Sequence, residues 1–224
     1  MMMTLLSGDG PRSRLLAVIL TCILIGLALA PFLFPGVRSV DTAARICVFI
    51  LLVASYDLML GYGGIVSFAH TMFFGMGAYG VALACTHMER GFAGLIVGAG
   101  AGALLAALVA LLIGLFSLRV RAIFFAMITL AVASAVAVLV SQLSGLTGGE
   151  DGLSFKTPRE LTPAFKFGDP LFGVKLNGKL LSYYLVFFGS FILFLLLLRI
   201  VNSPFGRVLQ AIRENDFRTE AIGY

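Results

Sequence analysis

Asp57, Ser67 and His70 are the notable polar side chains within the apolar stretches of the sequence. An ionisable group inside a membrane is costly to desolvate, so such residues mark transport pathways by default. A structural explanation stands beside this one. Asp57 lies near the end of its apolar stretch, where a carboxylate reaches interfacial water. His70 has the chemistry to form a hydrogen bond between two helices. The residue types alone support both readings.

Glycines flank these polar residues in two groups, Gly61-Tyr62-Gly63-Gly64 and Gly75-Met76-Gly77. Glycine permits a break in a helix and a close approach of another backbone. In transporters, the N-terminus of a broken helix can face the carboxylate of a substrate, which would suit an amino acid. Close helix packing explains the same glycines, so both interpretations remain open.

Side chains with catalytic or metal-binding chemistry are few. Glu150 and Asp151 lie in the glycine-rich segment from Thr147 to Gly152, which lacks the spaced oxygen ligands of a calcium loop. His70 and His87 have no nucleophile, metal ligand or second carboxylate at a useful spacing. The sequence therefore predicts no catalytic residue, no metal site and no cofactor.

The composition is that of a membrane protein. Hydrophobic residues make up 60% of the chain and charged residues 12%, whereas roughly a quarter of residues are charged in soluble domains. The mean hydropathy is +1.04. The net charge of +5 comes from basic residues scattered between apolar runs, so no basic face for nucleic acid is expected.

Six apolar runs are candidates for membrane-spanning segments. Lipid offers no partners to exposed backbone groups, so each run must be helical, and the sequence predicts an all-α, polytopic helical bundle with about six transmembrane helices. The second and third runs are separated only by Gly61 to Gly64, so one of them is a candidate for a broken or re-entrant helix. The runs are Leu15 to Phe34, Ile46 to Leu60, Ile65 to Cys85, Phe92 to Leu118, Ala122 to Leu143 and Tyr183 to Val201.

Arginine placement predicts the orientation, because positive residues beside span ends favour the cytoplasm. Arg12 and Arg14 place the N-terminus in the cytoplasm, and six crossings return the C-terminal segment there. Arg38 and Arg45 would then lie in the first outer loop. A long extracytoplasmic loop is expected at about 144–182, with a hairpin turn at Asn177-Gly178 between short extended segments, 174–176 and 179–181.

The fourth run carries small residues at every fourth position, which places them on one helical face. Such a stripe predicts close packing against another helix, and we favour a helix of the same chain over one of a second subunit. The stripe consists of Gly94, Gly98, Gly102, Ala106, Ala110 and Gly114.

The segment after the last run reads as an amphipathic helix. Ser203 and Pro204 form a helix start, and the apolar residues Phe205, Val208, Leu209 and Ile212 follow at helical spacing. Asn215-Asp216 then ends this helix and caps a second short turn that finishes near Gly223. The helix could dock on a cytoplasmic partner or lie on the membrane surface.

Several ordered blocks resemble branched-chain amino acid ABC transporter permeases, with the order and spacing of the M-type permease. The resemblance runs from about residue 45 to the end, although Ala69 replaces the usual glycine before His70 and 220–223 is a loose version of the importer coupling motif. The blocks are Leu60 to Gly64, Ser67 to His70, Phe73 to Tyr79, Ile123 to Leu130, Thr147 to Gly152 and Ser203 to Asn215.

This resemblance implies a non-catalytic subunit of the bacterial inner membrane that works by alternating access. Its partners would be ABC ATPase subunits, a second permease subunit, a periplasmic substrate-binding protein and membrane lipid. Residues 1–201 would form the transmembrane permease domain and 202–224 the cytoplasmic coupling segment. Family members continue past the coupling loop, so an ending at Tyr224 is expected to reflect a fragment or a shortened chain.

The alternative function is an ion-coupled secondary transporter or channel that uses Asp57 or His70 rather than ATP, and a purely structural membrane subunit is a third reading.

The resemblance, together with the polar residues and glycines described above, gives two sets of expected site residues. The expected substrate path is Asp57, Gly63, Gly64, Ser67, His70, Gly75, Gly77 and Tyr79. The expected contacts to the ATPase are Phe205, Arg207, Leu209, Ile212, Arg213, Glu220 and Gly223.

Overall fold

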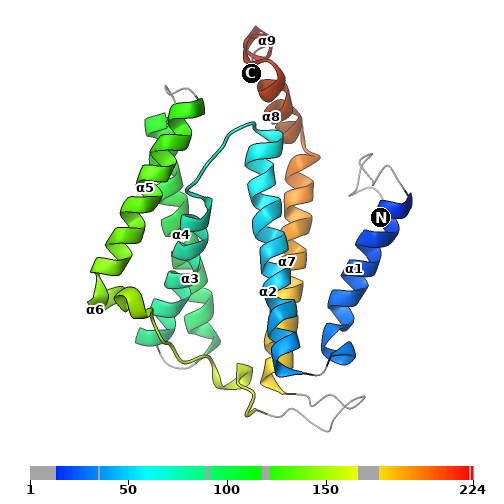
Figure 1. Cartoon of the computed structure of the whole chain (residues 1–224), viewed down its shortest axis with the longest axis vertical. Coiled ribbons are helices and arrows are strands. Elements are labelled where there is room, and N and C mark those ends of the chain that lie inside the picture. Colours follow the sequence, from blue (N-terminus) through cyan, green and yellow to red (C-terminus); the bar gives the residue numbers. More distant parts are fainter. Residues whose placement is uncertain are drawn as a thin grey trace. The chain divides into compact units, whose positions relative to one another are not determined.

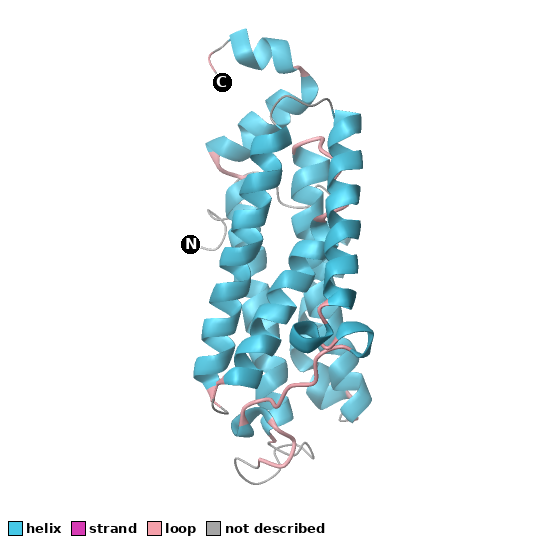
Figure 2. Ribbon diagram, turned by 90° about the vertical axis from the view of Figure 1, so that its left-hand side faces the viewer, coloured by secondary structure: helices cyan, strands magenta, loops and turns pink. Residues whose placement is uncertain are grey.

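The computed structural model describes residues 14–34, 36–88, 91–117, 122–165, 177–221 and 223, and over these residues it contains helices and no strand (Figures 1 and 2). Each of the six predicted apolar runs corresponds to a long helix. These are α1 (Arg14–Leu33), α2 (Val37–Asp57), α3 (His70–His87), α4 (Phe92–Ser117), α5 (Ala122–Gln142) and α7 (Gly178–Val201).

Four segments are long and apolar enough to cross a membrane: Arg38–Tyr62, Phe92–Ser117, Ile123–Gln142 and Gly178–Val201. A shorter apolar helix covers Ala17–Leu33. The all-α, multi-pass membrane bundle is therefore confirmed. The number of crossings and the cytoplasmic N-terminus remain predictions.

Helices α4 and α5 begin at the predicted residues, Phe92 and Ala122. Helices α2 and α7 begin earlier than expected, because hydropathy finds the apolar part of a helix and misses a polar start. Helix α2 begins nine residues before Ile46, so Arg38 and Arg45 lie in the helix and not in a loop. A charge pair lies near the starts of α2 and α7, where the Lys179 Nζ atom is 2.7 Å from an Asp41 carboxylate oxygen.

The predicted hairpin at Asn177-Gly178 is wrong. Gly178 begins α7, and Asn177 is its N-cap residue. The Asn177 carbonyl accepts the backbone N–H groups of Leu180 and Leu181, which makes 179–181 the first turn of a helix. The other expected strand, 174–176, lies outside the described residues. The loop between α5 and α7 includes three short helices, α6 (Ser144–Thr147), η2 (Gly149–Asp151) and η3 (Arg159–Leu161).

The chain forms two compact units, residues 1–64 with 161–224, and residues 65–160. The first unit contains α1, α2 and α7, followed by α8 (Pro204–Glu214) and α9 (Asp216–Ala221). Helix α2 packs along α7. The Asp41–Lys179 pair lies near the start of both helices, and the two helices run parallel, while α1 runs antiparallel to both (Figure 1).

A tyrosine in α7 supplies the hydrogen bond that a proline in α1 cannot make. Pro31 has no backbone N–H, so it cannot donate to the Leu27 carbonyl four residues earlier. The Tyr183 hydroxyl donates to that carbonyl instead, at 2.5 Å, and the Tyr184 hydroxyl donates to the Ala28 carbonyl at 3.1 Å. Two adjacent tyrosines thus attach α1 to α7.

The second unit is built on a close, antiparallel contact between α3 and α4. A methyl group added at Gly98 would lie 2.6 Å from the Val81 Cα atom, and one added at Gly102 would lie 3.0 Å from the Gly77 Cα atom. Gly94, Gly98 and Gly102 are buried. This confirms the prediction that the stripe packs within the chain, but only for its first half, because a methyl group at Gly114 would meet no atom within 4 Å.

Helix α5 joins this pair through a small apolar core. Ala69, Met72 and Ile113 are buried there, and half-buried side chains of α5 pack against them. Those from α5 are Phe125, Val132, Ala133 and Val136.

Candidate functional site

The break expected between the second and third helices is present. Helix α2 continues into a π-helical turn, η1 (Leu58–Tyr62), and α3 starts only at His70. Gly63 and Gly64 end the turn by donating their N–H groups to the carbonyls of Leu58 and Leu60, both at 3.2 Å. Gly64 has φ +68, a backbone conformation that side chains disfavour. The structure shows an interruption between Tyr62 and His70 and a continuous α3 through Gly75 and Gly77. Whether the region 61–85 spans or re-enters the membrane stays a prediction.

Two hydroxyl groups hold the extended segment that precedes α3. The Ser67 hydroxyl oxygen accepts the Ala69 N–H at 3.3 Å. The Thr129 hydroxyl oxygen, on α5, accepts the Phe68 N–H at 3.1 Å and donates to the Ala126 carbonyl of its own helix. Ser67 and Thr129 are 4% and 1% exposed. Two buried hydroxyl oxygens therefore fix the backbone of residues 68 and 69 within a largely apolar interior.

The start of α3 lies inside its unit. The Thr129 anchor is seven residues beyond Ala122, the first residue of α5. At 1.5 Å per residue, α3 begins roughly 10 Å inside the end of α5. Figure 1 shows the same offset between the two helices. The first turn of a helix presents unpaired backbone N–H groups and a partial positive charge, so this recessed start has the chemistry to attract a carboxylate.

The structure divides the expected path residues between the two units. Asp57, Gly63 and Gly64 belong to the first unit, and Ser67, His70, Gly75, Gly77 and Tyr79 to the second. His70 and Tyr79 are half-buried. The Gly77 Cα atom lies against α4 at Gly102, which shows the packing role that the sequence left open, whereas a methyl group at Gly75 would meet no atom within 4 Å.

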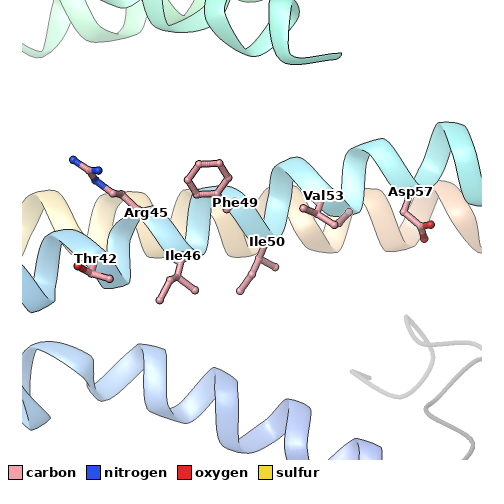
Figure 3. A pocket seen from close by; sticks show the side chains of 8 residues that line it. Thr42, Arg45, Ile46, Phe49, Ile50, Val53 and Asp57 are labelled. Atoms are coloured by element: carbon pink, nitrogen blue, oxygen red, sulfur yellow. The ribbon is translucent and has the colours of Figure 1, made fainter. Parts of the chain in front are cut away.

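Asp57 closes one end of an apolar groove along α2. It is exposed, and its carboxylate lies against the backbone of Gly61, where an added methyl group would be 2.5 Å from Oδ1. The groove has a volume of about 580 Å³ (Figure 3). Its lining residues all come from α2 and are Thr42, Arg45, Ile46, Phe49, Ile50, Val53, Ala54 and Asp57.

The predicted amphipathic helix after the last long helix is α8, and it starts where the sequence indicates. The Ser203 side chain accepts the Gly206 N–H at 3.4 Å and donates to the Ile200 carbonyl at 2.6 Å. The Asn215 side chain then accepts the Arg218 N–H at 3.1 Å and starts α9. Both capping predictions are confirmed.

The expected coupling residues have different surroundings. Phe205 and Ile212 are 61% and 39% exposed, and Leu209 is half-buried. Arg207 and Glu220 are exposed, and Gly223 has φ +93. Arg213, in contrast, reaches back to its own unit, where its guanidinium donates to the Gly61 carbonyl.

The sequence analysis assigned no structural role to three residues that the structure shows to be important: Thr129, Tyr183 and Gly206. A threonine within an apolar helix and a tyrosine pair near a helix start were signals, but neither identifies its partner. Gly206 is buried because the end of α7 passes over it, so an added methyl group would collide with the Val201 carbonyl.

Comparison with known proteins shows similarity to permeases of branched-chain amino acid transport systems. The family model of the branched-chain amino acid transport system permease component matches residues 39–224. The high-affinity branched-chain amino acid transport system permease proteins LivM of Salmonella typhimurium and Escherichia coli are each 27% identical over 199 residues, covering 83% of this chain and 46% of the relative. A probable branched-chain amino acid transport permease protein LivM of Methanocaldococcus jannaschii is 35% identical over 94 residues, covering 42% of this chain and 24% of that protein.

The chain spans about half the length of the two bacterial relatives. No solved structure matches it. The matched range contains the residues of η1, α3, α5 and α8 described above. The chain belongs to the family of branched-chain amino acid transport system permease components.

Proposed function

We propose that the chain is a permease subunit of an ATP-driven importer that carries branched-chain amino acids, or a related small solute, across the bacterial inner membrane. The observation that carries this proposal is α8, a capped amphipathic helix that follows α7 directly and exposes Phe205 and Ile212. The family match supports the solute class. ATP hydrolysis belongs to partner subunits in this scheme.

Helix α8 would dock on an ABC ATPase subunit. Apolar side chains at both ends of the helix, Phe205 and Ile212, suit insertion into a groove on a partner, which is the usual mode for an amphipathic helix. The alternative is a helix that lies on the membrane surface. A periplasmic binding protein would deliver the solute, and a second permease subunit would complete the path.

The recessed start of α3 would contribute to the path. An amino acid carries a carboxylate, and the N-terminus of a broken helix stabilises such a group. Ser67 and His70 lie at this helix start. Asp57, Gly63, Gly64, Gly75 and Tyr79 remain path candidates from the sequence alone, while Gly77 also serves helix packing.

Reconstitution tests the transport function. The chain, a second permease and the ATPase subunits are placed in proteoliposomes with a binding protein outside, and uptake of labelled leucine is measured with and without ATP inside. Uptake that requires ATP is expected. Uptake by this chain without any ATPase would instead support an ion-coupled carrier.

A separate experiment tests the docking role of α8. We expect Phe205→Asp and Ile212→Asp to abolish co-purification of the ATPase, because each places a charge in an apolar contact. Gln210→Asp is the matched control, since Gln210 is an exposed polar residue of the same helix. Unchanged assembly in the first two variants would exclude α8 as the docking helix.

A further inference from the structure

Arg213 connects α8 to the end of α2. It is in the last turn of α8, and its guanidinium donates a hydrogen bond to the Gly61 carbonyl oxygen within η1. The last carbonyls of a helix have no donor within the helix, and a cation there also interacts favourably with the helix dipole. The contact therefore satisfies a carbonyl that the end of the helix exposes.

The aliphatic part of the Arg213 side chain packs on the adjacent glycine. A methyl group added at Gly64 would lie 2.9 Å from the Arg213 Cγ atom and 3.5 Å from its Cβ and Cδ atoms. Gly64 also has φ +68. Glycine thus fits position 64 for two reasons: it adopts a positive φ without strain, and it leaves room for the Arg213 side chain that crosses over it.

Electrostatics favours the same arrangement. The Asp57 carboxylate lies against Gly61, one turn earlier on the helix. The Asp57 carboxylate and the negative end of the helix dipole both lie at this end of the helix, and both attract a guanidinium. Arginine suits this position because its planar guanidinium presents five N–H donors in a fixed arrangement.

We propose that Arg213 is a positioning residue that locks α8 to η1, so that the helix expected to dock on the ATPase and the end of α2 move as one body. The inference rests on the proposed function for its role in transport. It changes the role of Arg213 from a contact with the partner to a contact within the chain. The chain leaves η1 through Gly63 and Gly64 directly into the extended segment before α3, so a movement of α8 would act first on that segment.

Spin labels test the lock in the purified chain, without any transport measurement. One label on α8, at Gln210→Cys, and one on α2, at Val53→Cys, report the distance between the two helices. Both positions are exposed. The native cysteines, which are replaced by alanine, are Cys22, Cys47 and Cys85.

We expect a narrow distance distribution in the wild type and a broad one in Arg213→Ala, with the fraction of undocked α8 rising about tenfold or more for the loss of a charged hydrogen bond. Arg213→Lys should restore part of the narrow peak. Arg218→Ala is the charge-matched control on α9 and should leave the distribution narrow. A narrow distribution in Arg213→Ala would overturn the lock.

Gly64→Ala tests the same contact from the other side. The added methyl group displaces the arginine stem without removing its charge, so the variant should broaden the distribution as Arg213→Ala does. Gly26→Ala is the control, because a methyl group there meets no atom within 4 Å. If Gly64→Ala stays narrow, Arg213 does not need the packing surface that Gly64 provides.

Transport measurements separate the lock from the proposed function. In proteoliposomes, Arg213→Ala should still bind the ATPase but move fewer solute molecules per ATP hydrolysed, and Arg213→Lys should recover part of that ratio. An unchanged ratio would overturn the positioning role. If the wild-type chain shows no ATP-dependent uptake, the proposed function fails, and the label distances alone decide whether Arg213 locks α8.

Discussion

The Tyr183 hydroxyl donates a hydrogen bond to the Leu27 carbonyl oxygen, which Pro31 leaves without its usual helical donor. Tyr183 is 1% exposed. A carbonyl freed by proline inside a membrane helix needs another partner, because lipid supplies none. The hydroxyl of Tyr183 therefore replaces the helical donor that Pro31 lacks, although the two residues are more than 150 positions apart in the sequence.

Tyr183→Phe should weaken the attachment of α1 to α7. The variant keeps the ring and removes the donor, so the Leu27 carbonyl loses its partner. Hydrogen bonds between membrane helices contribute about 0.5–2 kcal/mol, and we expect a loss of that size. The free energy of unfolding in mixed detergent micelles measures it.

Pro31→Ala provides the internal control. Alanine restores a backbone N–H that can donate to the Leu27 carbonyl, so the tyrosine hydroxyl becomes less important. In a double-mutant cycle, Tyr183→Phe should therefore cost less in the Pro31→Ala background. An equal cost in both backgrounds would show that the hydroxyl does not serve that carbonyl.

A second prediction concerns the contact of α3 with α4. Gly98→Ala should destabilise the second unit by about 1–3 kcal/mol, the usual cost of overpacking, because the added methyl group would lie 2.7 Å from the Gly80 carbonyl oxygen. Gly100→Ala, two residues further, meets no atom within 4 Å. Alanine favours the helix over glycine, so this control should not destabilise. Thermal unfolding in detergent compares the two, and equal melting temperatures would contradict the close approach.

The third prediction concerns the anchor of the segment before α3. Thr129→Val keeps the β-branched shape but removes the oxygen that accepts the Phe68 N–H. Leaving a buried donor unpaired costs about 1–3 kcal/mol, so residues 65–69 should exchange their amide hydrogens faster. Hydrogen exchange with mass spectrometry measures this.

Ser134→Ala is the control on the same helix. The Ser134 hydroxyl donates to the Leu130 carbonyl of α5 itself, so its loss should leave exchange in 65–69 unchanged. If both variants behave alike, Thr129 does not anchor the segment.

The positions of the helices could be predicted because the apolar runs and caps are local. Ser203 before Pro204 set the start of α8, and Asn215 set the start of α9, as the structure shows. The start of α2 was missed because Arg38 and Arg45 are polar, and a first helical turn needs no apolar residue when it reaches the interface. Caps and apolar residues thus predict where a helix begins, whereas a start made of polar residues is missed.

Partners between distant segments could not be predicted. Gly61 and Arg213 are 152 residues apart, and Phe68 and Thr129 are 61 apart. Periodicity reports which face a residue lies on, but not which helix meets that face. For the same reason, the sequence left open whether Gly77 packs on another helix, and its Cα atom lies against α4 at Gly102.

The last prediction concerns the corner between α7 and α8. Gly206 is buried under the end of α7, where an added methyl group would collide with the Val201 carbonyl and lie 2.8 Å from the Ile200 carbonyl oxygen. Backbone atoms cannot move aside as a flexible side chain can. Gly206→Ala should therefore displace the first turn of α8 and loosen the cap that Ser203 forms on it.

Hydrogen exchange over 204–214 should rise in Gly206→Ala, and co-purification of the ATPase should fall. Gly189→Ala is the control, because Gly189 lies within α7 and a methyl group there meets no atom within 4 Å. The two measurements distinguish a change in the corner between α7 and α8 from a loss of ATPase docking. Faster exchange with normal ATPase binding would mean that the corner is tight but that docking tolerates movement of α8. Unchanged exchange would mean that the corner accommodates a side chain, and the close passage of α7 over Gly206 would then not fix the direction of α8.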